Sequence, residues 1–201
     1  MRASPHVAPL EALGLVAPAV GRLATYLDTL AAWARRVNLT GARTPAERVE
    51  RLVAGILPVA DVPEPGTLID VGSGNGSPGL VLALLRDDLE ITLLEPRTRR
   101  WAFLREAARR TGRPHIRVLR ERHHAFAGEP ARTVTVRALA LPLGELASLV
   151  RPGGQVIVLG RAPALEGPFE PQSQVASGRG VHIFRRCGER VPRGTLGSEE
   201  P

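Results

Sequence analysis

The sequence contains no lysine and very few aromatic residues. All 27 of its strongly basic residues are arginine, against 20 acidic residues, so the net charge is +7. Arginine stays charged in proteins and binds phosphate through two parallel N–H groups, so this composition is compatible with a nucleic-acid partner. Phe, Trp and Tyr make up only 3% of the chain. Stacking on an aromatic platform is therefore not expected as the main way of holding a base.

Cysteine is almost absent as well. The single cysteine, Cys187, excludes an internal disulfide framework and any metal site built from several cysteines, and it suits a reducing compartment. No apolar run reaches the roughly 18 residues that a membrane span requires. Residues 7–20 are mildly apolar, but Pro9, Glu11 and Pro18 interrupt them, which makes a poor signal peptide. We therefore expect a cytoplasmic protein without a membrane partner.

The most informative motif occupies residues 68–79 and reads Leu-Ile-Asp-Val-Gly-Ser-Gly-Asn-Gly-Ser-Pro-Gly. An apolar run ends near Asp70, a glycine-rich turn follows, and residues 80–85 suit the buried face of a helix. Strand, glycine-rich turn and helix in this order begin the nucleotide site of a doubly wound sheet. Glycine lets backbone N–H groups and a helix N-terminus approach a ligand closely. The motif therefore predicts a nucleotide-like cofactor.

Strands and helices alternate after this motif begins. We expect strands over residues 67–71, 90–95, 116–119, 133–136, 155–159 and 180–185, helices over 79–85, 97–111 and 143–150, a turn over 151–154 and a loop over 162–178. Upstream, apolar residues at steps of three and four predict a helix over 21–37, and the capping box at 44–47 predicts a second helix that runs to about Leu57. The chain therefore divides into a helical N-terminal segment (1–62), an α/β Rossmann-like domain (63–191) and a mobile tail (192–201).

Of two carboxylates near this motif, Asp70 favours S-adenosylmethionine over a dinucleotide, whereas Glu95 suits either cofactor. The loop also fits the G-x-G-x-x-G pattern of NAD sites, but alone this match is weak. Asp70 can order the loop and meet the cationic amino-acid end of S-adenosylmethionine, whereas it would repel a pyrophosphate. Glu95 ends the second strand, where a carboxylate accepts hydrogen bonds from the ribose hydroxyls of either cofactor. One compact sheet also leaves no second domain for a hydride acceptor. We predict that S-adenosylmethionine is held by Asp70, Gly72, Ser73, Gly74, Gly76 and Glu95, with an NAD-dependent oxidoreductase as an alternative.

Several motifs together are similar to those of the bacterial small-subunit ribosomal RNA guanine-N7 methyltransferases (the GidB or RsmG family). They are Asn38-Leu39-Thr40, the loop 69–79, Thr92-Leu93-Leu94-Glu95, Phe103-Leu104, Val136-Arg137-Ala138 and Gly153-Gly154, in family order. The resemblance implies a class I S-adenosylmethionine-dependent methyltransferase fold and methyl transfer to N7 of a guanine in 16S rRNA. Guanine N7 carries a free lone pair, so no proton has to be removed before attack and alignment is the main requirement.

The resemblance also implies roles for individual arginines. Arg137, at the end of the fourth strand, is assigned to catalysis through contact with an RNA phosphate or the acceptor edge of the target guanine; a surface ion pair is the alternative. Arg122 matches an arginine of the family and is assigned to the cofactor site. An RNA contact and a structural role remain alternatives for it. RNA contacts are assigned to Arg51, Arg97, Arg99, Arg100 and Arg161; for the three that follow Glu95 (Arg97, Arg99 and Arg100), a solvated helix face is the alternative. No metal site is expected, because the adjacent His123 and His124 point in different directions.

Some positions depart from the family pattern. Leu52 and Gly55 stand where polar residues are usual, and Asn75 and Ser77 replace an alanine and an aromatic residue. Several of these losses concern the substrate side. Two further hypotheses therefore stay open: a non-catalytic RNA- or ribosome-binding module, and a methyltransferase with another substrate. We expect a monomer whose partner is ribosomal RNA or the small ribosomal subunit.

Overall fold

A seven-stranded sheet forms the centre of the computed structural model, which describes residues 3–113, 115–172 and 180–188. The strand order is β3-β2-β1-β4-β5-β7-β6. Their bounds are β1 (Gly66–Val71), β2 (Leu89–Leu94), β3 (Arg117–Leu119), β4 (Ala131–Arg137), β5 (Val150–Leu159), β6 (Phe169–Pro171) and β7 (Val181–Arg186). Strands β1 to β5 pair in parallel, and β7 runs antiparallel to both of its neighbours. The order reverses between β1 and β4, which creates the switch point where open α/β sheets bind ligands.

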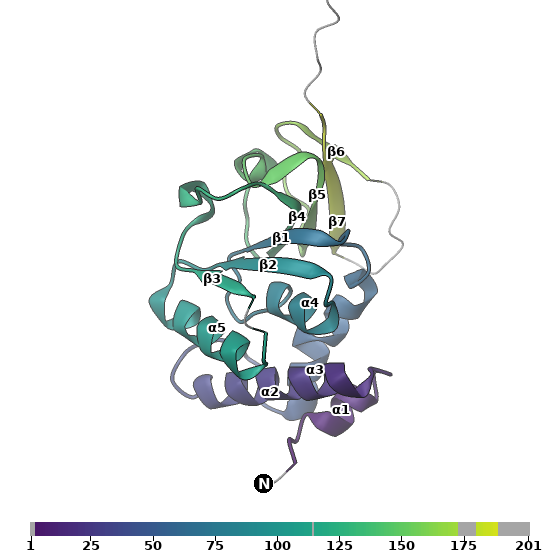
Figure 1. Ribbon diagram of the computed structural model, residues 1–201, viewed down its shortest axis with the longest axis vertical. Helices are drawn as coiled ribbons and strands as arrows, with labels where there is room; N and C mark the ends of the chain where they lie inside the picture. Colours follow the sequence, from purple (N-terminus) through teal and green to yellow (C-terminus); the bar gives the residue numbers. More distant parts are fainter. Residues whose placement is uncertain (1–2, 114, 173–179, 189–201) are drawn as a thin grey trace, which may run out of the picture.

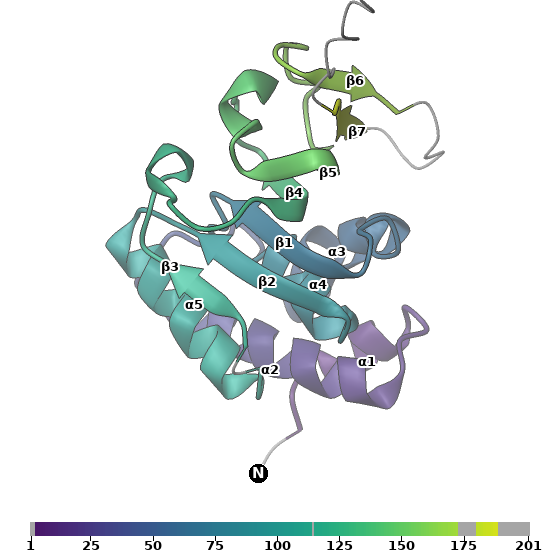
Figure 2. The same ribbon diagram turned by 45° about the horizontal axis from the view of Figure 1, so that its top comes forward.

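The α-helices gather on one face of the sheet (Figures 1 and 2). They are α1 (Val7–Glu11), α2 (Ala17–Trp33), α3 (Pro45–Leu52), α4 (Gly79–Leu85) and α5 (Thr98–Arg110). The opposite face is covered by the short 3-10 helix η3 (Leu143–Leu146) and by loops, and it has an apolar cluster of its own. Two further 3-10 helices, η1 (Ala54–Val59) and η2 (His123–Ala125), lie in connections.

The N-terminal helices share a core with the sheet. Tyr26 of α2 and Phe103 of α5 are fully buried, with ring centroids 6.5 Å apart, and the edge of Trp33 meets Phe103 at 6.1 Å. Leu23 and Leu27 of α2 belong to the same buried cluster as sheet and α4 residues. Burial of these large side chains, at roughly 1.5–3 kcal/mol each, fixes α2 against the α/β core. The helical segment can therefore place groups beside the switch point.

Most of the expected elements are present, and two predictions upstream are partly wrong. The helix expected over 21–37 is α2, which begins at Ala17 and ends at Trp33. The helix over 79–85 and the first three strands lie within one residue of the expected bounds. The capping box is confirmed, because the Thr44 hydroxyl accepts a hydrogen bond from the Glu47 N–H at 3.2 Å. The helix that it starts ends at Leu52 rather than Leu57. Pro58 follows, and its ring would clash with the carbonyl of Ala54 in a continuous α-helix, so the chain tightens into η1 instead.

Three further predictions after β4 need correction. The helix over 143–150 is reduced to η3, because the chain already pairs as β5 from Val150, opposite Ala131. The turn predicted over 151–154 is the beginning of that strand, beside an irregularity in its register. The loop over 162–178 contains β6, which is only three residues long and shows no alternating pattern. Residues 192–201, predicted as a tail, lie outside the described residues. In the described part of the chain, no helix combines the length and the apolar character needed to cross a membrane.

Candidate active site

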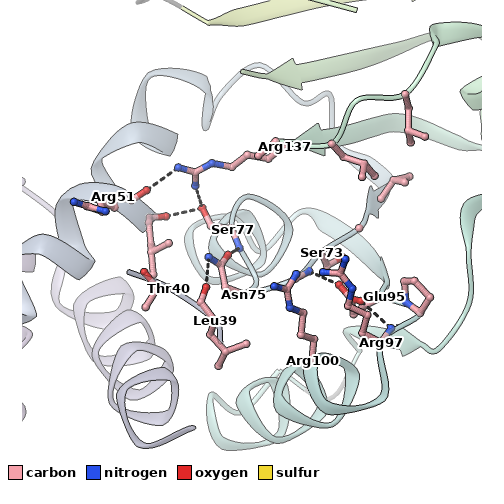
Figure 3. A pocket seen from close by; sticks show the side chains of 18 of the residues that line it. Leu39, Thr40, Arg51, Ser73, Asn75, Ser77, Glu95, Arg97, Arg100 and Arg137 are labelled. Carbon is pink, nitrogen blue, oxygen red and sulfur yellow. Dashed lines mark hydrogen bonds between the residues drawn. The ribbon is translucent and has the colours of Figure 1, made fainter. Parts of the chain in front are cut away.

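A cavity of about 1010 Å³ opens at the carboxyl ends of β1, β2 and β4, at the switch point of the sheet. Four segments of the sheet domain contribute to its wall: the glycine-rich loop (72–77), the residues after β2 (95–100), those after β3 (121–123) and those after β4 (138–141). The N-terminal segment contributes residues 39–41 and 50–55. Figure 3 shows side chains from both parts converging on this cavity.

Glu95 holds the glycine-rich loop from the sheet side. Its carboxylate is almost fully buried; one oxygen accepts a hydrogen bond from the Gly74 N–H at 2.9 Å and the other from the Arg97 N–H at 2.8 Å. Gly74 has φ +52°, and a Cβ there would fill the cradle, 3.7 Å from an Arg100 guanidinium nitrogen. An ionised carboxylate has about four acceptor sites, so it can still accept from two ribose hydroxyls. These residues therefore fit the adenosine end of S-adenosylmethionine.

Asp70 lies behind the loop rather than in the wall of the cavity. The Thr135 hydroxyl donates to its Oδ1 at 2.7 Å, whereas Oδ2 has no hydrogen-bond partner among the described residues. Burial raises the pKa of Asp70 from its ordinary value of 3.8 to about 6, against the lowering effect of the Thr135 hydroxyl. Helix α4 begins directly against this carboxyl group, since a Cβ on Gly79 would lie 2.5 Å from the Asp70 Cβ. Asp70 is therefore placed to order the loop from the side that faces away from the cavity.

The N-terminal segment holds the same loop from the other side. The buried Tyr26 hydroxyl donates to the Asn75 carbonyl at 2.7 Å. The Asn75 amide donates to the Leu39 carbonyl at 3.1 Å, and its side-chain oxygen accepts from the Ser77 N–H at 3.1 Å. Burial raises the pKa of the Tyr26 phenol well above its usual range, so this hydroxyl remains a donor. One helix, α2, and the loop around Leu39 thus hold the glycine-rich loop from outside the sheet.

Arg137 connects the end of α3 to the glycine-rich loop (Figure 3). One guanidinium nitrogen donates to the Arg51 carbonyl at 2.7 Å and the other to the Ser77 hydroxyl oxygen at 2.5 Å. The Ser77 hydroxyl in turn donates to the Leu52 carbonyl at 2.8 Å. Burial lowers the pKa of Arg137 below its ordinary value. A guanidinium has five N–H groups, so Arg137 retains donors for a ligand in the cavity.

The structure brings most of the predicted site residues together. Those in the cavity wall are Arg51, Gly72, Ser73, Gly74, Glu95, Arg97, Arg100, Arg122 and Arg137. Asp70 and Gly76 are not in this wall, and a Cβ on Gly76 would face Leu80 and Tyr26. Arg99 is exposed on the first turn of α5. Arg161 lines a neighbouring hollow after β5 instead.

Several wall residues had no role in the sequence analysis. Leu39 and Thr40 were part of a recognised motif without an assigned function, and Asn75 and Ser77 were treated only as departures from a pattern. A polar side chain in a glycine-rich loop is a signal that could have indicated their hydrogen bonds. His123 also lines the cavity and pairs with Glu145 at 2.7 Å. Within the described ranges, no three His, Cys, Asp or Glu side chains are grouped to hold a metal ion.

Replacing Asp70 by asparagine should change how stability depends on pH. The pKa of Asp70 in the folded protein is about 6, above the ordinary value of 3.8. The stabilisation from its protonated form is therefore complete below pH 3.8 and is lost as the pH rises through about 6. Asp70→Asn removes this dependence. Urea unfolding measures the difference in the free energy of unfolding between Asp70→Asn and the wild type. This difference should rise by about 1–2 kcal/mol, in favour of the variant, between about pH 5 and about pH 8.

The control for this experiment is Val16→Ala, because Val16 is exposed and carries no titratable group. Its difference from the wild type should not vary with pH. A difference for Asp70→Asn that is equally constant would contradict the perturbed titration of the buried carboxyl.

Several known proteins that are similar to this chain in sequence or in fold are methyltransferases. A profile of the family described as rRNA small subunit methyltransferase G matches residues 20–174. The ribosomal RNA small subunit methyltransferase G of Alkalilimnicola ehrlichii is 37% identical over 171 residues, which cover 82% of this chain and 78% of that protein. Its counterpart from Paracoccus denitrificans is 39% identical over 131 residues, covering 64% of this chain and 67% of that protein. The solved structure of a SAM-dependent methyltransferase from Aquifex aeolicus shares the fold with a TM-score of 0.50, at 14% identity, over 69% of this chain and 90% of that one.

Proposed function

The chain belongs to the rRNA small subunit methyltransferase G family, and on this premise we propose that it transfers a methyl group from S-adenosylmethionine to N7 of a guanine in 16S rRNA. The observation that carries the proposal is one cavity lined by both the Glu95 carboxylate and the Arg137 guanidinium. Membership of this family favours a methyltransferase over a nicotinamide oxidoreductase and over a non-catalytic RNA-binding module.

The residues of the chain would hold the two reactants by different means. Glu95 would accept from the ribose hydroxyls of the cofactor beside Gly74, while the backbone at Gly72 would leave room for its amino-acid end. Asp70 keeps the loop in position from behind, and Arg122 lies on the wall after β3. When bound, S-adenosylmethionine would supply a methyl group on a positively charged sulfur; as the N7 lone pair forms the new N–C bond, the S–C bond breaks and its electrons stay on the neutral sulfur of S-adenosylhomocysteine.

Arg137 is the residue we assign to the substrate. Two of its N–H groups are held by the Arg51 carbonyl and the Ser77 hydroxyl, so the guanidinium has a fixed direction. The remaining N–H groups can donate to guanine O6 or to a phosphate, which leaves the N7 lone pair free for attack. Holding the two reactants in line can lower the barrier by roughly 7–11 kcal/mol without any proton transfer.

The same reasoning suggests how the rest of the substrate lies. Arg51, Arg97, Arg99, Arg100 and Arg161 are proposed to contact RNA phosphates around the cavity. A ribosomal RNA substrate implies action in the cytoplasm on the RNA or on the small subunit, and we propose that the chain acts as a monomer.

The direct test is incorporation of labelled methyl from S-adenosylmethionine into small ribosomal subunits that lack the modification. We expect N7-methylguanine in the 16S rRNA. Arg137→Ala should reduce kcat by about tenfold or more, because a charge-assisted contact to the substrate is lost. Incorporation into another base, or into no RNA at all, would refute the proposed function, and a wild-type kcat for Arg137→Ala would refute its assigned role.

Glu95→Gln should weaken binding of S-adenosylhomocysteine about tenfold or more in a calorimetric titration. The variant keeps the size of the side chain but loses the charge that strengthens hydrogen bonds from ribose hydroxyls and from the Gly74 N–H. Glu90→Gln on the exposed side of the same strand is the control and should bind as the wild type does. Equal affinities for both variants would exclude Glu95 from the cofactor site.

A further inference from the structure

The positive charge of this chain is concentrated in one short segment. Residues 96–120 contain nine arginines and one acidic residue, Glu106, and therefore carry a net charge of +8, whereas the whole chain carries +7. The rest of the chain, with 18 arginines and 19 acidic residues, is close to neutral. This segment comprises α5 and β3, which lie side by side at one edge of the sheet (Figures 1 and 2).

Most of this charge is available to a ligand. Arg109 and Arg110 pair with Glu106, and Arg113 pairs with Asp87. In the described part of the chain, the other six have no acidic side chain within 4.0 Å; these are Arg97, Arg99, Arg100, Arg105, Arg117 and Arg120. All of them are exposed except Arg100, which is half-buried. A surface with so many uncompensated guanidinium groups attracts a polyanion.

Trp101 organises two of these arginines. Its indole N–H donates to the Val118 carbonyl of β3 at 3.2 Å, which fixes the ring between α5 and the edge strand. The Arg105 guanidinium carbon lies 5.0 Å from the centroid of the ring, and that of Arg120 lies 5.9 Å from it. Trp101 and Arg105 are one helical turn apart, so both lie on the same side of α5. We call Trp101, Arg105 and Arg120 the Trp101 cluster.

Stacking on an indole suits an arginine for phosphate binding. The cation–π contact restricts where the guanidinium lies, and a guanidinium has five N–H groups, so donors remain for phosphate oxygens. Since the rotamers are already restricted, less conformational freedom is lost when the ligand binds. The cluster is therefore preorganised for phosphates.

The cluster adjoins the cavity but is not part of it. Thr98, whose hydroxyl lies 3.5 Å from an Arg120 guanidinium nitrogen, follows the wall residue Arg97 in the chain. On the other side, Arg120 precedes the wall residue Glu121. An RNA strand that leaves the cavity over the first turn of α5 would therefore cross the Trp101 cluster.

We infer that the Trp101 cluster is a phosphate-binding clamp that grips ribosomal RNA outside the methyl-transfer cavity. The inference rests on the proposed function for the identity of the RNA. Arg105 and Arg120, which do not line the cavity, would then bind RNA phosphates, and Trp101 would hold these two arginines in place. RNA affinity should then depend on residues that the cofactor does not touch.

The test is filter binding of 16S rRNA transcribed in vitro over a range of salt concentrations. Arg105→Ala/Arg120→Ala should weaken binding about tenfold or more and reduce the slope of log K against log salt by about 1.5, because two phosphate contacts are lost. Arg110→Ala/Arg151→Ala removes the same charge from exposed positions away from the cavity and should stay within about threefold of the wild type. Trp101→Leu keeps every charge and should still weaken binding by about threefold.

Calorimetry with S-adenosylhomocysteine shows that each variant is folded, and methyl incorporation by the wild type tests the proposed function separately. Equal losses in the two double variants would mean that only total charge matters and would overturn the clamp. Wild-type RNA binding by Arg105→Ala/Arg120→Ala, or an absence of RNA binding by the wild type, would overturn it too. Unchanged binding by Trp101→Leu would overturn the supporting role of the indole.

Discussion

The glycine-rich loop is held between two hydrogen bonds that come from different parts of the chain, and the rest of the site depends on this arrangement. The Glu95 carboxylate accepts from the Gly74 N–H on the sheet side, and the Tyr26 hydroxyl donates to the Asn75 carbonyl on the helical side. Glycines at 72, 74 and 76 all have positive φ, a conformation that costs chain entropy to maintain. Buried partners on both sides offset this cost, so the loop is already shaped for a cofactor.

This arrangement links cofactor and substrate physically. Ser77 belongs to the loop, yet its hydroxyl accepts from Arg137 and donates to the Leu52 carbonyl at the end of α3. The N-terminal segment therefore forms a wall of the cavity, and the end of α3 helps to fix the position of Arg137. At the outer edge of α5, the Trp101 cluster extends the same helix into an RNA-binding surface. One helix thus contributes to the core, the cavity rim and the proposed grip on RNA.

The sequence predicted the parts that depend on local pattern. Strand, glycine-rich turn and helix, with Glu95 one strand later, were sufficient to predict that the loop and this carboxylate line one cavity at the carboxyl ends of the strands. The partners of Arg137 could not be foreseen, because two of them are a backbone carbonyl and a serine that only the tertiary fold brings near. Tyr26 also escaped notice, since its spacing is that of any buried position on α2. Strand β6 was missed because three residues carry no periodicity.

Calorimetric titration of Tyr26→Phe with S-adenosylhomocysteine measures how far the N-terminal helices shape the cofactor loop. The substitution removes one hydroxyl, keeps the buried ring and leaves the Asn75 carbonyl without its donor. We expect micromolar binding by the wild type and about tenfold weaker binding by the variant, which should remain folded. Equal affinities would contradict this shaping role and would mean that the sheet domain alone determines the cofactor site.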